Sequence, residues 1–283
     1  MLREKIKKEV MIFDGGMGTQ LQAAGMKAGE IPEVYNIEHP EIIIDIHSRY
    51  LKAGANFITT NTFGCNPLKM ADSGYCYCDL LKSAVDNAKK ARDAVNKDAY
   101  IVLDIGPIGQ MLKPLGNLTF DEAYEIIASQ VLMVKDDVDA VLLETMSDLY
   151  EVKAGILAVK ENSDLPVFVT MTFEKNGRTL TGCDPITYIN VVEGLGVDAL
   201  GVNCSLGPKE LKPIVEAILD GTHMTQMRTG AATGAAFDIL GVMDAKVGAM
   251  IGTGGQAATQ LEAMLAVRKL EIVKVYDLDA QRL

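Results

Sequence analysis

Chemically useful side chains follow five short apolar runs of the sequence. These groups lie at residues 14–19, 61–66, 104–107, 144–148 and 203–208. Glycines let backbone amides approach a ligand closely, and the carboxylates of Asp14 and Glu144 can accept hydrogen bonds from an ammonium group. With the Cys204 thiol, such a site would suit a zwitterionic amino acid that carries sulfur. Backbone amides would hold the carboxylate of this amino acid, and a metal bound by the thiolate would hold its sulfur.

The apolar runs are predicted strands, because continuous apolar runs suit strands buried on both faces of a parallel sheet. They lie at residues 10–13, 57–60, 101–103, 140–143, 167–171 and 199–202. Helical patterns alternate with them at residues 41–52, 119–135, 147–160 and 208–219. Thr119 and Glu122 form a capping box at the start of the second helix. Repeated strand–helix units imply right-handed βαβ crossovers, which bring the carboxyl ends of the strands together.

Eight such units would close a (β/α)₈ barrel, and six are clear up to residue 220. Two more fit if residues 224–228 and 247–251 are strands, although residues 222–234 are polar and glycine-rich. An open doubly wound sheet is the alternative, but no Gly-x-Gly-x-x-Gly turn follows the first strand. We therefore predict an α/β fold, a TIM-type barrel with an atypical seventh and eighth unit. It is predicted as one domain over residues 1–283, with residues 220–283 divergent.

Each candidate group also has an ordinary structural explanation. Paired glycines often make tight turns, Glu144 could belong to a helix start, and Cys204 alone could be a small buried apolar residue. The pair Cys76 and Cys78 is a poor zinc signal, since no further ligands lie nearby. A ligand site is favoured because two carboxylates and a thiol at the ends of three strands would converge on one cavity.

The same segments, in the same order, resemble the homocysteine S-methyltransferase family. They are Asp-Gly-Gly-Met-Gly-Thr at 14–19, Thr-Asn-Thr-Phe-Gly at 60–64, Asp-Ile-Gly-Pro at 104–107, Glu-Thr-Met-Ser-Asp at 144–148 and Gly-Val-Asn-Cys-Ser-Leu-Gly-Pro at 201–208. The resemblance runs from about residue 8 to residue 220. It is strongest to the N-terminal homocysteine-binding barrel of cobalamin-dependent methionine synthase.

The resemblance implies methyl transfer to the thiol of homocysteine, which forms methionine. The methyl donor would be methylcobalamin on a separate corrinoid protein, or a small sulfonium compound such as S-methylmethionine. In the family, three cysteine thiolates hold Zn²⁺, which binds the homocysteine sulfur and lowers its pKa. Cys204 matches the first of these metal ligands, and Asn203 matches the residue beside the metal.

The resemblance also assigns the groups that hold the amino acid. Asp14 and Glu144 match the carboxylates that bind the amino group of homocysteine. The remaining substrate-binding residues would be those of the first glycine-rich loop, which holds the carboxylate, and one residue after the second strand: Gly15, Gly16, Met17, Gly18, Thr19 and Asn61.

The sequence departs from the family at the other two zinc ligands. The family has adjacent cysteines after the eighth strand, where this chain has Gly254 and Gly255, and no cysteine follows Cys204. Three explanations are open. The chain could be a divergent member without the three-cysteine zinc site, its coding sequence could have decayed, or Cys65 or Cys183 could enter the site. The alternative function is a catalytically impaired barrel that binds a thiol or amino acid.

Composition excludes several classes of partner. With 38 acidic and 27 basic residues the net charge is −11, which disfavours binding to nucleic acid or to an anionic membrane. Residues 1–9 are charged and no long apolar stretch follows, so we expect neither a signal peptide nor a membrane anchor. Five cysteines without a regular framework predict reduced thiols in a cytoplasmic protein. A length of one barrel implies that any corrinoid comes from a partner.

Overall fold

The chain divides into two compact units, residues 1–214 and residues 215–283. A computed structural model describes residues 2–251 and 257–277, with side chains for all of these except residues 220–232, 240, 258 and 259. The prediction of a single domain over residues 1–283 stays a prediction.

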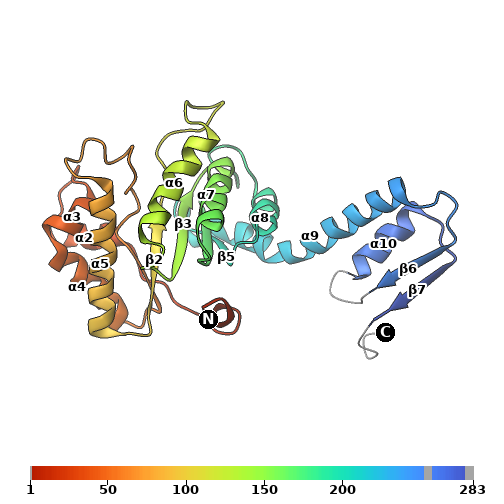
Figure 1. The fold of residues 1–283 in the computed structure, drawn as a ribbon, viewed down its shortest axis with the longest axis horizontal. Helices are drawn as coiled ribbons and strands as arrows, with labels where there is room; N and C mark the ends of the chain where they lie inside the picture. Colours follow the sequence, from red (N-terminus) through yellow and green to blue (C-terminus); the bar gives the residue numbers. More distant parts are fainter. Residues whose placement is uncertain (1, 252–256, 278–283) are drawn as a thin grey trace. The chain divides into compact units, whose positions relative to one another are not determined.

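The first unit contains a parallel five-stranded sheet in the order β1-β2-β3-β4-β5 (Figure 1). Its strands are β1 (Phe57–Thr59), β2 (Tyr100–Ile105), β3 (Ala140–Met146), β4 (Val167–Met171) and β5 (Ala199–Val202). Each strand pairs in parallel with the next one along the chain. Five of the six strands predicted up to residue 202 are therefore confirmed, and their carboxyl ends lie at one edge.

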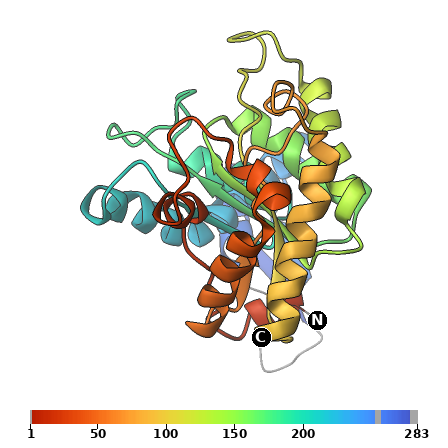
Figure 2. The same ribbon diagram turned by 90° about the vertical axis from the view of Figure 1, so that its left-hand side faces the viewer.

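Helices alternate with these strands, as the repeated pattern predicted. The helical elements that begin in the first unit are α1 (Leu2–Ile6), α2 (Met17–Ala23), η1 (Pro32–Val34), α3 (Tyr35–Glu38), α4 (Pro40–Lys52), α5 (Tyr77–Val95), α6 (Phe120–Val134), α7 (Leu149–Asn162), α8 (Pro185–Gly194) and α9 (Pro208–Leu240). Helices α4 and α5 pack side by side (Figure 2), and α6 packs against α7. The capping box of Thr119 and Glu122 is present at the start of α6.

The first predicted strand, residues 10–13, forms only an isolated bridge between Phe13 and Phe57. The segment accepts hydrogen bonds from the β1 side, where the amides of Asn56 and Phe57 donate to the carbonyl of Ile12. On its other side, no strand of the described first unit pairs with it, and Val10 is 96% exposed. A regular strand was thus wrong for this segment, because an apolar run forms a ladder only where a neighbour supplies hydrogen bonds.

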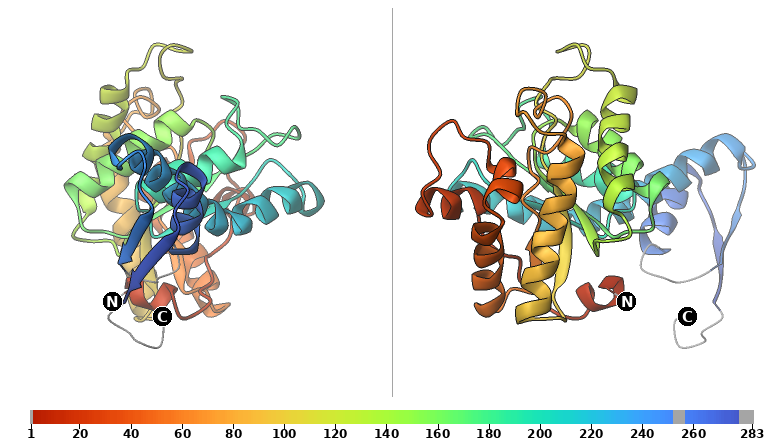
Figure 3. Two further views of the ribbon diagram at one scale, coloured as in Figure 1. Left: turned by 90° about the vertical axis from the view of Figure 1, so that its right-hand side faces the viewer. Right: turned by 60° about the vertical axis from the view of Figure 1, so that its left-hand side comes forward.

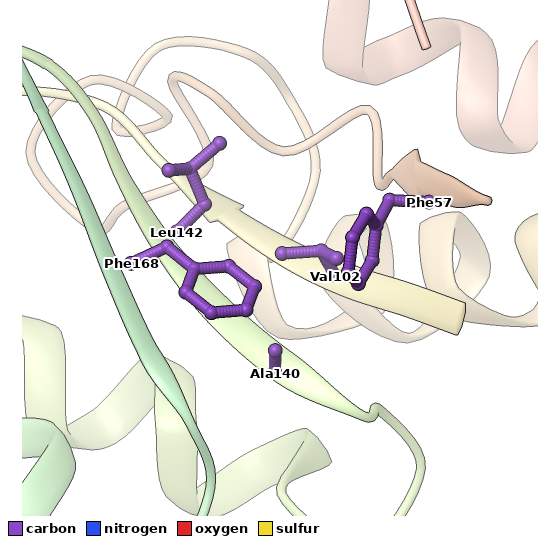
Figure 4. Packing of buried hydrophobic residues seen from close by; sticks show 5 residues of the cluster. All are labelled: Phe57, Val102, Ala140, Leu142 and Phe168. Carbon is purple, nitrogen blue, oxygen red and sulfur yellow. The ribbon is translucent and has the colours of Figure 1, made fainter. Parts of the chain in front are cut away.

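One face of the sheet carries a cluster of large apolar side chains (Figure 4). Its buried members are Phe57, Val102, Ala140, Leu142 and Phe168, and Leu2 and Ile6 of α1 pack against them. Alternate residues of a strand point to opposite faces, so Leu103 and Leu143 face the helices instead. Leu143 lies so close to α7 that a Cβ atom on Gly155 would be 2.9 Å from it. Both faces of the central strands are therefore covered.

The amino-terminal end of the sheet is held by a recurring contact. A side-chain oxygen just before one strand accepts a hydrogen bond from an amide in the neighbouring strand or segment. The three contacts run from Ile12 N to Asn56 Oδ1 (2.9 Å), from Ile101 N to Asp139 Oδ2 (2.7 Å) and from Val167 N to Asp198 Oδ2 (2.9 Å). These bonds fix the register of the strands at the edge opposite to the polar segments found by sequence.

The second unit contains β6 (Val247–Ile251), α10 (Ala257–Val267) and β7 (Ile272–Tyr276). The two strands pair in parallel and lie side by side (Figure 3). The prediction of a strand at residues 247–251 is confirmed, whereas that at residues 224–228 was wrong, since this segment is part of α9. Met, Gln and Arg favour a helix over a strand, and no proline interrupts residues 214–240. Among the described residues, no helix is long and apolar enough to cross a membrane.

Candidate functional site

A cavity of about 830 Å³ lies in the first unit, along the face of the sheet that carries Phe57, Leu142 and Phe168. It reaches the carboxyl ends of the strands, where four carboxyl side chains line it: those of Asp14, Glu33, Asp104 and Glu144. An apolar floor with a few polar groups at one end is typical of a site for a small molecule.

Most residues that the sequence singled out line this cavity. They are Asp14, Gly15, Gly16, Met17, Gly18, Asn61, Glu144 and Cys204. Thr19 and Asn203 are not among the lining residues. Thr19 donates to the carbonyl of Gly16 at 3.1 Å, and Asn203 Nδ2 donates to Thr145 Oγ1 at 2.7 Å. Asn203 Nδ2 also lies 3.5 Å from Glu144 Oε1, so it connects the ends of β3 and β5.

The carboxyl group of Asp14 is fixed at the end of β1. Its Oδ2 accepts a hydrogen bond from the amide of Thr59 at 2.9 Å, and its Oδ1 accepts one from the Thr59 hydroxyl at 3.0 Å. Burial raises the pKa of Asp14 to about 7, with a smaller contribution from the charge of Glu144, although the hydrogen bonds oppose the shift. Near neutral pH this group therefore changes charge readily, and a nearby cation would favour its ionised form.

Asp104, like Glu33, is almost fully buried, with 5% of the residue exposed. Burial, followed by the charges of Glu144, Asp14 and Glu33, raises the pKa of Asp104 well above its usual range. The pKa of Glu144 is also raised by burial, whereas its hydrogen bond with Asp104 lowers it. The sequence placed Asp104 at a strand end but did not include it among the site residues, because the burial of a carboxyl group is not visible in a motif.

Backbone strain gathers at the ends of β3 and β5, where Thr145 and Cys204 line the cavity. Thr145, Cys204 and Ser205 adopt the left-handed region, with φ of 55°, 57° and 55°. Such conformations cost about 1–3 kcal/mol each in non-glycine residues, and they are most unusual for β-branched threonine. The hydroxyl of Thr145 lies 3.7 Å from Cys204 Sγ. Thr145 is thus a second residue of the site that sequence reasoning missed.

The other cysteines lie away from the cavity lining. Cys65 Sγ donates to the carbonyl of Tyr77, and burial strongly raises its pKa; burial also raises the pKa of Cys183 to about 11. The structure does not bring either thiol to the cavity where Cys204 lies. Cys76 and Cys78 form a disulfide, with Cα atoms 5.2 Å apart. Reduced thiols were therefore wrong for this pair, since two cysteines on either side of one residue at the start of α5 can meet disulfide geometry without a regular framework.

The residues present do not fit a three-thiolate zinc site. Catalytic zinc sites use three protein ligands. Within residues 2–251 and 257–277, as far as their side chains are described, no three His, Cys, Asp or Glu side chains are grouped to hold a metal. Gly254 and Gly255, which the resemblance aligns with the missing cysteines, lie outside the described residues, and glycine has no side-chain ligand to offer.

We expect the purified protein to carry well below one equivalent of zinc, because a single thiolate does not hold this ion tightly. Elemental analysis by mass spectrometry after dialysis against metal-free buffer would measure the content. Cys204→Ser and the control Cys183→Ser should leave it equally low. A full equivalent of zinc in the parent protein that disappears only in Cys204→Ser would contradict this expectation.

Comparisons of the sequence point to proteins of methionine synthesis. The methionine synthase of Mycobacterium leprae is 34% identical over 227 residues, which is 74% of this chain and 19% of that protein. The methionine synthase of Mycobacterium tuberculosis is 32% identical over the same length. The chain thus spans about a fifth of the length of these curated relatives.

Comparison of the structures agrees in fold. The homocysteine methyltransferase MmuM of Escherichia coli matches with TM-scores of 0.65 in its metallated form and 0.61 in its apo form. The metallated form is 19% identical, with 98% of this chain and 95% of that chain covered. The α/β fold of TIM-barrel type predicted from the sequence is thereby confirmed. The family model described as "Homocysteine S-methyltransferase" matches residues 11–264, and the chain belongs to that family.

Proposed function

We propose that the chain binds homocysteine in the described cavity and transfers a methyl group to its thiol, which yields methionine. The observation that carries this proposal is the pair of partly buried carboxyl groups, Asp14 and Glu144, in one cavity with Cys204. A buried anionic pair favours a bound ammonium group, because a cation stabilises the ionised carboxylates. The methionine synthases among its relatives support the same substrate.

Different residues of the chain would bind the different groups of homocysteine. Asp14 and Glu144 would hold the ammonium group, and the amides of the loop from Gly15 to Thr19 would bind the carboxylate. Asn61 donates to the carbonyl of Pro32 at 2.8 Å and to Asn36 at 3.1 Å, so it shapes the cavity wall and leaves only an acceptor free. The substrate sulfur would then lie towards Cys204 and Asn203.

In the transfer step, the homocysteine sulfur forms a bond to the methyl carbon while the bond between that carbon and the donor breaks. The thiol proton must pass from the sulfur to water, because the thiolate is the better nucleophile. The described residues do not fit zinc. The donor would be methylcobalamin on a separate corrinoid protein, or a small compound such as S-methylmethionine. A cytoplasmic location is part of the proposal.

A binding barrel without turnover is the second candidate. The poor fit of the residues to a zinc site favours it, because the family activates the homocysteine thiol with that metal. Under this alternative, Asp14 and Glu144 would still bind the amino acid, but no group would lower the pKa of its thiol enough for transfer.

Two measurements separate these functions. We expect isothermal titration calorimetry to show binding of L-homocysteine, and mass spectrometry to show methionine formed from methylcobalamin or S-methylmethionine, with and without added Zn²⁺. Binding without methionine in any of these reactions would favour the binding barrel. Absence of homocysteine binding to a folded protein would contradict both functions.

A further inference from the structure

One oxygen atom in the cavity lacks a partner. Asp104 lines the cavity and its side chain is almost fully buried, yet its Oδ1 accepts no hydrogen bond. A buried polar atom without a partner costs free energy, so such atoms are uncommon in folded proteins and require an explanation. A ligand that supplies the missing donor is one explanation.

The strand end does not need this carboxyl group. The amide of Asp104 donates to Thr60 Oγ1 at 3.1 Å, and its carbonyl accepts from Thr62 Oγ1 at 2.6 Å. The two threonine hydroxyls lie 2.6 Å apart. The backbone of residue 104 is therefore held by β2 and by the threonines that follow β1. The side chain shares a hydrogen bond with Glu144, and its Oδ1 is left for another partner.

A primary ammonium group has three N–H donors, whereas Asp14 and Glu144 provide only two carboxyl groups. We propose that Asp104 is the third acceptor for the ammonium group of the amino-acid substrate, and that it gives up a proton to solvent when this group binds. The inference rests on the proposed function, because the ammonium group is that of homocysteine. With this role, Asp104 would favour amino acids with a free ammonium group over N-acylated amino acids.

The charges around the cavity explain the proton release. Asp104 faces the carboxyl groups of Glu144, Asp14 and Glu33, and several buried carboxylates cannot all be ionised without a cation. Among the described side chains, Lys69 lies near Glu33 and Glu151 but does not line the cavity. The bound ammonium group keeps its charge, the neutral Asp104 carboxyl loses H⁺ to water, and a charged pair replaces the unpartnered oxygen.

The experiment uses L-methionine, which has the same ammonium group but no thiol proton to confuse the count. Titration calorimetry at pH 8, in two buffers of different ionisation enthalpy, gives the affinity and the number of protons released. This pH lies above the value of about 7 for Asp14, so that Asp14 is mostly ionised beforehand. We expect the parent protein to release up to one proton, and N-acetylmethionine not to bind.

Asp104→Asn keeps the shape of the side chain but removes its charge. We expect it to weaken L-methionine binding roughly 10- to 100-fold and to reduce the proton release, since a hydrogen bond to a charged group is lost. Glu151→Gln is the matched control. Glu151 is also a buried acid, with its pKa raised to about 7 by burial, but it accepts from Ile108 N outside the cavity lining. The Glu151→Gln variant should leave the affinity for L-methionine and the number of released protons unchanged.

The outcomes distinguish the inference from the function on which it rests. If the parent protein binds L-methionine without proton release, or if folded Asp104→Asn binds as tightly as the parent, the role of Asp104 is overturned while the proposed function stands. If neither L-methionine nor L-homocysteine binds to the folded parent, both fail. If Asp104→Asn does not fold, the absence of proton release from the parent protein would still overturn the role of Asp104.

Discussion

Replacing Asp14 with asparagine is expected to weaken homocysteine binding roughly 10- to 100-fold at pH 8, because a charge-assisted hydrogen bond to the ammonium group is lost. In the parent protein, affinity should fall as the pH drops below about 7, where Asp14 takes up a proton, by roughly tenfold per pH unit. The variant should lose the change near pH 7 that Asp14 causes, and keep only the dependence that comes from the proton of Asp104. Calorimetric titrations with L-homocysteine from pH 5.5 to pH 8 would measure both effects.

Asp14 makes the folding stability fall as the pH rises, whereas it makes the affinity for homocysteine rise. Since the pKa of Asp14 is raised in the folded state, its neutral form contributes stability that is present at low pH and is lost as the pH rises through about 7. Asp139→Asn is the matched control, because Asp139 also accepts from a strand amide, that of Ile101, but at the opposite edge of the sheet. Two results would refute the role of Asp14 in binding the ammonium group. One is unchanged affinity for homocysteine in Asp14→Asn, and the other is a change of affinity near pH 7 that persists in this variant.

Replacing Leu143 with alanine is expected to destabilise the first unit by about 2–5 kcal/mol. Leu143 is fully buried between β3 and the helices, where it lies close to Gly155 of α7. A truncated side chain leaves a cavity that such close packing cannot fill. Amide hydrogen exchange of β2, β3 and β4 would report the loss for this unit alone, whatever the second unit does.

The control for this change is Leu132→Ala on α6, since Leu132 is 50% exposed. A change at that position should alter the exchange of the same strands by about 0.5 kcal/mol or less. Equal effects of the two variants would mean that the interface between β3 and α7 is not closely packed.

The sequence predicts the central elements well because their local and long-range signals agree. Strand β3 is an apolar run flanked by helices, and α6 begins with the capping box of Thr119 and Glu122, as expected. Prediction failed where a pattern depends on a neighbour. Residues 10–13 are as apolar as the other runs but pair on one side only, and residues 224–228 are helical although the barrel rhythm called for a strand.

The site was predictable to the same extent. Motifs at strand ends predict that Asp14, Glu144 and Cys204 meet, since parallel strands bring their carboxyl ends together, and all three line one cavity. Asp104 and Thr145 could not be selected in this way. The importance of Asp104 lies in its unpartnered, buried oxygen, and that of Thr145 lies in its left-handed backbone. Both properties arise from packing in three dimensions.

The left-handed residues at the ends of β3 and β5 have a consequence for protein engineering. Glycine at position 145, 204 or 205 would relieve strain of about 1–3 kcal/mol per residue, so a search for heat-resistant variants would select these changes early. Each of them would also remove a hydroxyl or thiol from these strand ends. Selection for heat resistance and selection for ligand binding would therefore act in opposite directions on these three positions. A library that leaves the three positions unchanged would select for heat resistance without altering these side chains.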